Sequence, residues 1–66
     1  MNKFIEIITR NGCKVYIAIS HIQVIGELTK NKEDGNTYVS CDDNIYYIYE
    51  NYNSLIQRLQ AILNNN

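Results

Sequence analysis

The chain has 66 residues, of which 45% are hydrophobic and 20% charged, and its formal net charge is −1. This length holds one domain, taken as residues 1–66, with one small core, and the composition argues against disorder. A charge this close to zero gives no long-range attraction to nucleic acid or to an anionic membrane. No apolar run reaches the roughly 20 residues of a membrane-spanning helix or forms a signal-peptide core. We therefore expect a cytoplasmic protein without a membrane segment.

The first two predicted strands cover residues 3–9, KFIEIIT, and 13–19, CKVYIAI, because apolar side chains alternate along both. Asn11 and Gly12 between them are typical of a type I′ hairpin turn, in which both central residues have positive φ. Ser20 interrupts the alternation and indicates a short turn after the second strand. The chain is thus expected to open with a β-hairpin.

Three more strands are predicted at residues 22–28, 37–41 and 45–49. Gly26 in the first of these indicates a bulge or the close approach of another group. The polar stretch 29–36, TKNKEDGN, is expected to be a surface loop.

From residue 52 the apolar residues follow the spacing of an amphipathic helix. Asn51 is the expected N-cap, with Asn53 as the alternative, and Glu50 lies near the positive end of the helix dipole. The predicted fold is therefore α+β, with a small antiparallel sheet of four to five strands followed by one C-terminal helix packed on one face. The apolar helix positions are Leu55, Ile56, Leu59, Ile62 and Leu63.

The more apolar side of each strand is assigned to the core beneath the helix. These inward residues are Ile5, Ile7, Val15, Ile17, Ile19, Ile22, Val24, Val39, Cys41, Tyr46 and Ile48. The other side of the sheet then carries an aromatic patch, which is the predicted interaction face. Its residues are Tyr16, Tyr38, Ile45, Tyr47 and Tyr49, with Phe4 and Ile25 nearby.

An exposed apolar patch on a small domain usually contacts another molecule, and tyrosine suits such contacts because its ring packs while its hydroxyl stays hydrated. We therefore expect a non-catalytic interaction module that forms a homo-oligomer, with another protein as the next candidate partner. The competing interpretation is that an AT-rich genome supplied the tyrosines without selection, since the codons of Asn, Ile, Lys and Tyr are rich in A and T.

Single-stranded nucleic acid is the alternative ligand, because bases can stack on exposed aromatic side chains. Such sites normally combine the aromatic side chains with a basic groove. Here Lys14 is the one basic residue beside Tyr16, and the chain as a whole is slightly acidic. Nucleic acid is therefore the less favoured partner.

The sequence predicts no catalytic residue, no cofactor and no metal site. His21 is the only histidine and has no nucleophile placed with it, so it is interpreted as a turn residue. Asp42 and Asp43 supply too few oxygen ligands for calcium and indicate a solvated turn. Cys13 and Cys41, in a chain with one histidine, do not make a zinc site and are expected to be free, partly buried thiols.

Two stretches, ITRNGCKVYIAISHIQVIGE and IYYIYENYNSLIQRL, combine an Asn-Gly hairpin, an isoleucine-rich segment and a strand that leads into a terminal helix. In this order of features and in its length, the chain from Phe4 to Leu63 resembles the small FlbD/SwrD-type bacterial motility proteins. The resemblance implies a small intracellular bacterial protein without known catalysis. The tyrosine content and the longer loop at 29–36 depart from that family.

Overall fold

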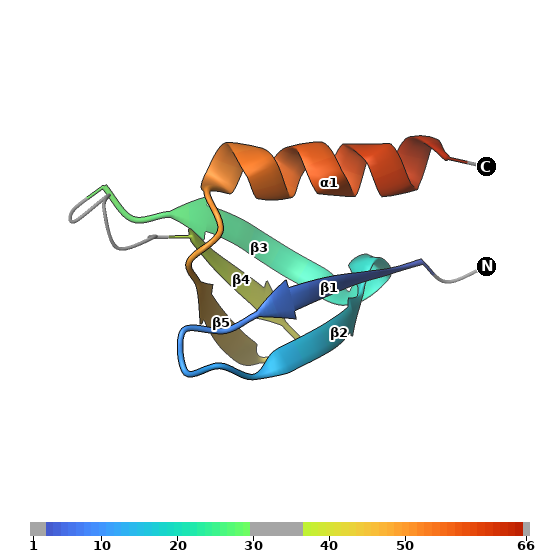
Figure 1. The fold of residues 1–66 in the computed structure, drawn as a ribbon. Coiled ribbons are helices and arrows are strands. Elements are labelled where there is room, and N and C mark those ends of the chain that lie inside the picture. The colour runs from blue at the N-terminus through green and yellow to red at the C-terminus, as the bar shows by residue number, and fades with distance from the viewer. Residues whose placement is uncertain (1–2, 30–36, 66) are drawn as a thin grey trace.

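The computed structural model describes residues 3–29 and 37–65, and this part of the chain contains five strands, one 3₁₀ helix and one α-helix (Figure 1). In chain order they are β1 (Phe4–Ile8), β2 (Lys14–Ala18), η1 (Ile19–His21), β3 (Ile22–Glu27), β4 (Thr37–Cys41), β5 (Asn44–Ile48) and α1 (Tyr52–Asn64). Each predicted strand and the predicted helix is present. Ser20 lies in η1, which turns the chain from β2 into β3. Residues 30–36 of the predicted loop at 29–36 lie outside the described residues.

The five strands form two antiparallel sheets, β1-β2 and β3-β4-β5, in place of one continuous sheet. The sheets meet at one end, where Thr9 bridges Ile48 and the Arg10 N–H donates to the Tyr47 carbonyl at 2.9 Å. In Figure 1 the β1-β2 hairpin crosses in front of the other three strands, and α1 runs along the top. The predicted α+β class is confirmed, with its strands divided between two layers.

The core lies between the two sheets and α1. Its buried apolar residues are Ile5, Ile7, Ile17, Val39, Cys41, Ile48, Leu55 and Leu59. Each strand residue in this set is one that the alternation of apolar side chains assigns to the core. Ile48 of β5 has no exposed surface and belongs to the same cluster as Leu55 and Leu59 of α1, so the last strand and the helix share one core.

The turn between β1 and β2 differs from the predicted type I′ turn. Gly12 has a φ of +90°, but Asn11 is not among the residues with positive φ. The Gly12 N–H donates to the Thr9 carbonyl, and the Thr9 N–H donates to the Cys13 carbonyl. These bonds define a three-residue hairpin loop, residues 10–12. A β-turn over residues 9–12 ends in Gly12, which has the left-handed conformation. The positive φ pair occurs instead at Asp42 and Asp43, which join β4 to β5.

Strand β3 contains a bulge, but at Gln23 and not at Gly26, where the sequence indicates a bulge or a close approach. Ile22 pairs with Cys41 and Val24 with Ser40, so Gln23 is an extra residue in the ladder. A bulge reverses the side on which the following side chains point. Val24, assigned to the core, is therefore 48% exposed, and Ile25, assigned to the open face, packs against the core.

Polar contacts fasten α1 to the rest of the domain. The Asn51 side chain accepts a hydrogen bond from the Asn53 N–H at 2.8 Å, which confirms Asn51 as the N-cap. At the other end, the Lys3 ammonium donates to the carbonyls of Ile62 and Leu63 at 3.0 and 3.3 Å. A cation at this position also interacts favourably with the negative end of the helix dipole.

A second contact, made by Arg58 in the middle of α1, links the helix to β1 and to Glu50 before it. Glu50 accepts hydrogen bonds from Arg58 Nε at 2.9 Å and from Arg58 Nη2 at 2.6 Å, while Nη2 also donates to the Glu6 carbonyl at 2.9 Å. Hydrogen bonds from Arg58 lower the pKa of Glu50, and the bonds to Glu50 raise the pKa of Arg58. Both shifts favour the charged forms of Glu50 and Arg58. The helix is therefore held against the first strand by a charged pair.

Candidate interaction surfaces

The β3-β4-β5 sheet turns one face away from the core, and its ladder places the predicted tyrosines on that face. Val24, Ser40 and Ile45 form one row across the three strands, and Gly26, Tyr38 and Tyr47 form the next. Tyr49 follows at the end of β5. The outer tyrosine face is defined here by Val24, Gly26, Tyr38, Ser40, Ile45, Tyr47 and Tyr49.

Four of the five residues of the predicted interaction face therefore lie together, and Tyr16 does not join them. Tyr16 lies on β2, in the other sheet, where its ring stacks on Phe4 with the centroids 5.3 Å apart. The division of the strands into two sheets is the reason, because the sequence pattern treats them as one surface.

The side chains of the outer tyrosine face are well exposed. The exposed fractions are 57% for Ile45, 44% for Tyr47 and 60% for Tyr49. With Val24 added, this amounts to on the order of 400 Å² of side-chain surface, which is the size of the largest apolar patch on many monomers and is often functional.

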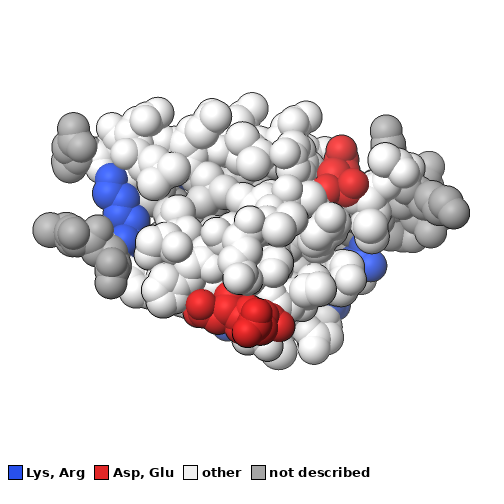
Figure 2. Space-filling view, turned by 180° about the vertical axis from the view of Figure 1, so that it is seen from behind, with Lys and Arg blue, Asp and Glu red and all other residues white. Residues whose placement is uncertain are grey.

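No charged side chain belongs to the two rows of the outer tyrosine face. Figure 2 shows the molecule from behind, where a broad central surface carries no Lys, Arg, Asp or Glu and the charged groups lie at its margin. Arg10 lies at one end of the face, with its guanidinium carbon 5.9 Å from the Tyr47 ring centroid and 5.7 Å from that of Tyr49. The sequence gives no signal for this contact, because Arg10 belongs to the other hairpin.

The Tyr38 ring packs directly over Gly26. A Cβ atom at Gly26 would lie 2.3 Å from Cζ of Tyr38, so the tyrosine ring occupies the place of the missing side chain. The ring also contacts Tyr47, with the centroids 6.2 Å apart. The close approach predicted at Gly26 is thus made by Tyr38, while the bulge lies earlier in the strand.

We expect Gly26→Ala to displace the Tyr38 ring and to lower the free energy of unfolding by about 1 kcal/mol, the lower end of the cost of overpacking, because the ring can rotate away. Urea unfolding of Gly26→Ala, Tyr38→Ala and the double variant measures this. The added methyl should cost clearly less in the Tyr38→Ala background. An equal cost in both backgrounds would show that the ring does not pack on Gly26.

A groove opens on the side of the domain between β2 and β5. One part of it, with a volume of about 470 Å³, is lined by residues of the β1-β2 turn, β2 and β5. A second part continues toward η1 and the β4-β5 turn, where Ala18, His21 and Asp42 line it. Val15 and Tyr46 line both parts; they pack against the core, as the sequence predicts, and are half-buried.

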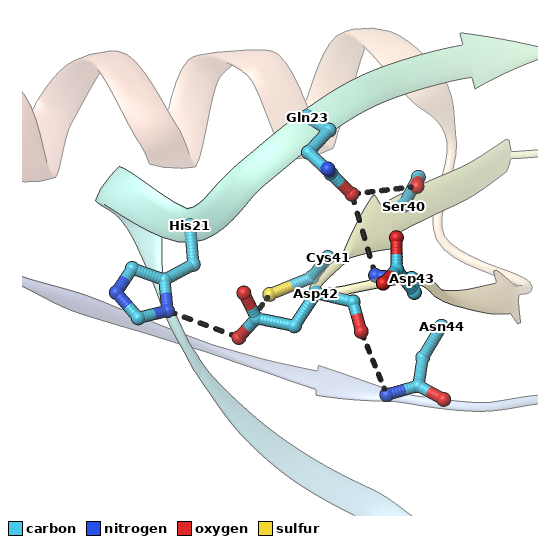
Figure 3. A network of polar contacts seen from close by, with 7 residues as sticks. All are labelled: His21, Gln23, Ser40, Cys41, Asp42, Asp43 and Asn44. Atoms are coloured by element: carbon cyan, nitrogen blue, oxygen red, sulfur yellow. Dashed lines mark hydrogen bonds and ion pairs between the residues drawn. The ribbon is translucent and has the colours of Figure 1, made fainter.

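A polar network surrounds the β4-β5 turn at one end of this groove (Figure 3). His21 Nδ1 lies 3.0 Å from Asp42 Oδ2, and both side chains are exposed. The Gln23 side-chain oxygen accepts hydrogen bonds from Ser40 Oγ and the Asp43 N–H, each at 3.4 Å. These contacts tie the turn to β3 and η1, in keeping with a structural role for His21.

The two cysteines are free and lie apart in the fold. Cys41 is buried, and this burial, with a smaller contribution from Asp42, raises the pKa of its thiol. A raised pKa disfavours the thiolate, which is the reactive form. Cys13 is exposed, contrary to the prediction of partial burial, because it follows the longer β1-β2 turn. Within residues 3–29 and 37–65, no group of three or more His, Cys, Asp and Glu residues is placed to hold a metal ion.

Comparisons with protein-family models, curated proteins and solved structures found no match. The resemblance to the FlbD/SwrD-type proteins therefore stays a prediction. In the described part of the chain, no helix combines the length and the apolar character that crossing a membrane requires.

Proposed function

We propose that this chain is a small non-catalytic protein-interaction module that self-associates through the outer tyrosine face. The observation that carries the proposal is an uncharged, aromatic sheet face bordered by charged residues (Figure 2). Interfaces are typically depleted of charge at their centre and enriched in tyrosine, with a polar rim.

A second copy of the chain is the partner that this chemistry favours. Burying an unpaired charge is costly in any interface, and two uncharged faces can meet without doing so. The tyrosine hydroxyls can stay hydrated at the edge of such a contact while the rings pack. Stable interfaces bury about 800 Å² on each partner, so the outer tyrosine face supplies roughly half of that area and the surrounding polar side chains supply the rest.

Sedimentation equilibrium of the wild type and of the Tyr47→Asp, Tyr49→Asp double variant tests the proposal. We expect the wild type to associate at micromolar concentration and the double variant to have a lower average mass, because two carboxylates on the face would be buried by association. Leu63→Asp, at an exposed helix position away from the face, is the matched control and should leave association unchanged. A strictly monomeric wild type, or association that the double variant does not alter, would refute the proposal.

Single-stranded nucleic acid is a second candidate ligand, favoured by one observation. Arg10 places a cation against Tyr47 and Tyr49, as in sites where bases stack on aromatic rings. The rows of the face contain no Lys or Arg, so this candidate ranks below self-association. Adding a single-stranded oligonucleotide to the same samples at low salt separates the two, since electrostatic binding is strongest there and quenching of tyrosine fluorescence reports it.

A further inference from the structure

The edge of β2 that borders the groove has no strand beside it in the described structure. Within residues 3–29 and 37–65, β2 pairs with β1 alone. The Ile19 N–H donates to the Lys3 carbonyl and the Thr9 N–H to the Cys13 carbonyl. Because hydrogen-bonded pairs alternate along an antiparallel ladder, Val15 and Ile17 bond to β1 as well.

The backbone N–H and C=O groups of Lys14, Tyr16 and Ala18 consequently point away from β1. A row of such groups is a template for an added strand. The two sheets have three other edges, at β1, β3 and β5. Strand β3 carries the bulge at Gln23 and a glycine at Gly26. The Glu6 carbonyl of β1 accepts a hydrogen bond from Arg58, and the Tyr47 carbonyl of β5 accepts one from the Arg10 N–H. Bulges and short irregular edges disfavour strand addition. The described length of β2 has neither a bulge nor a proline, so β2 is the edge suited to pairing.

We propose that β2 pairs in antiparallel fashion with β2 of a second copy, around a two-fold axis at Tyr16. In this register Tyr16 lies opposite Tyr16 of the partner subunit, and Lys14 lies opposite the partner's Ala18. The outward N–H and C=O groups of all three residues are then bonded. The two hairpins form one sheet in the order β1-β2-β2-β1. This contact is centred on the edge of β2 and not on the outer tyrosine face, although Ile45 and Tyr47 of that face line the part of the groove beside it.

The open groove beside β2 is the first reason why a second copy of the chain is the partner that pairs with this edge. The axis is perpendicular to the β1-β2 sheet, so the three-stranded sheets of both copies lie on the same side of the joined hairpins. The open sides of the two molecules then face each other, and the half-buried Val15 and Tyr46 of each copy are covered. The helix α1, which lies on the far side of each molecule, does not obstruct the contact (Figure 1).

Charge complementarity is the second reason. Lys14 stands at one end of β2, and the groove at the other end is lined by Ala18 and Asp42. Antiparallel pairing therefore brings Lys14 of each copy to the end of the groove that contains Asp42 of the partner subunit. Like charges are not placed opposite each other at any position of the register, since Lys14 faces the partner's Ala18.

The decisive experiment places charges at Tyr16, which is 68% exposed and can be replaced without opening the core. It uses a Val24→Asp, Tyr49→Asp protein, so that association through the outer tyrosine face does not contribute and Tyr47, which lines the groove, is unchanged. We expect this background to form a dimer. Adding Tyr16→Lys or Tyr16→Glu should weaken that dimer about tenfold, since equal charges then face each other across the axis and the aromatic pair is lost.

Mixing the Tyr16→Lys and Tyr16→Glu proteins in equal amounts should restore dimerisation, because opposite charges then meet. Tyr16→Thr, a neutral strand-forming residue, is the matched control and should be weakened less than either charged variant. Circular dichroism establishes that each variant is folded. The mass of each sample is measured by sedimentation equilibrium.

Two results would overturn the β2 pairing. One is a Val24→Asp, Tyr49→Asp background that is monomeric at high micromolar concentration, which would leave the outer tyrosine face as the only contact. The other is a dimer that responds to neither charge at Tyr16 nor their mixture. The reverse result, in which charges at Tyr16 break association and the Val24 and Tyr49 changes do not, would support β2 pairing and refute the outer tyrosine face.

Discussion

Replacing Ile48 by alanine is expected to lower the free energy of unfolding by about 2–5 kcal/mol, the range for large-to-small changes in a core. Ile48 has no exposed surface and lies in the cluster that joins both sheets to α1. It also pairs with Thr37 of β4 and bridges Thr9, so the cavity would lie where the two layers meet. A domain of this size has a total stability of only several kcal/mol, and the variant should be largely unfolded at 37 °C. Urea unfolding followed by circular dichroism measures the loss.

Ile45→Ala is the control, because it makes the same change on the same strand. Ile45 points outward and is 57% exposed, so its truncation creates no cavity. We expect a change within about 0.5 kcal/mol, as for most surface substitutions. Equal losses for the two variants would contradict the assignment of the inner and outer faces of β5.

The second large effect is expected at Arg58, where methionine would keep the length of the side chain and remove its charge. Arg58→Met loses both bonds to Glu50 and the bond to the Glu6 carbonyl. Hydrogen bonds to charged groups contribute about 1.5–3 kcal/mol when buried, and the partial exposure of both side chains places the expected loss near 1–2 kcal/mol. Thermal and urea unfolding measure this loss, and a stability unchanged from wild type would show that the pair does not hold α1 to β1.

The pH dependence of the same contact has a definite sign. The folded-state pKa of Glu50 lies below its usual value, chiefly because Arg58 donates to the carboxylate. Its contribution to stability is therefore fully present above the pKa of an unfolded glutamate, near 4.3, and is lost as the pH falls through the folded pKa. The stability difference between wild type and Glu50→Gln should be largest near neutral pH and shrink in acid. A difference that grows in acid would contradict this assignment.

The elements of this fold are predictable from the sequence because each has a strong local signal. Alternating isoleucines predict β1 and β2, and the spacing from Leu55 onward predicts α1. Asn51 is identifiable as the N-cap because its short side chain can accept a hydrogen bond from a backbone N–H of the first turn. All of these signals lie within one element and need no knowledge of what packs against it.

The errors come from features that span several elements. The bulge at Gln23 has no signal in the alternation of apolar side chains. Because of it, Val24 points to solvent and Ile25 packs against the core, the reverse of the prediction. The division into two sheets depends on how the hairpin folds over the other strands, and it separates Tyr16 from the outer tyrosine face. For the same reason the contact of Arg10 with Tyr47 could not be predicted.

The bonds from Lys3 and Arg58 have a consequence for the order in which the protein forms. They join β1 to α1 across most of the sequence, and such contacts close late because a long segment must first be brought together. A chain still growing on the ribosome can pair β1 with β2, but it cannot cover the buried faces of its sheets until α1 has emerged. The contacts that complete the core can therefore form only after α1 has been synthesised.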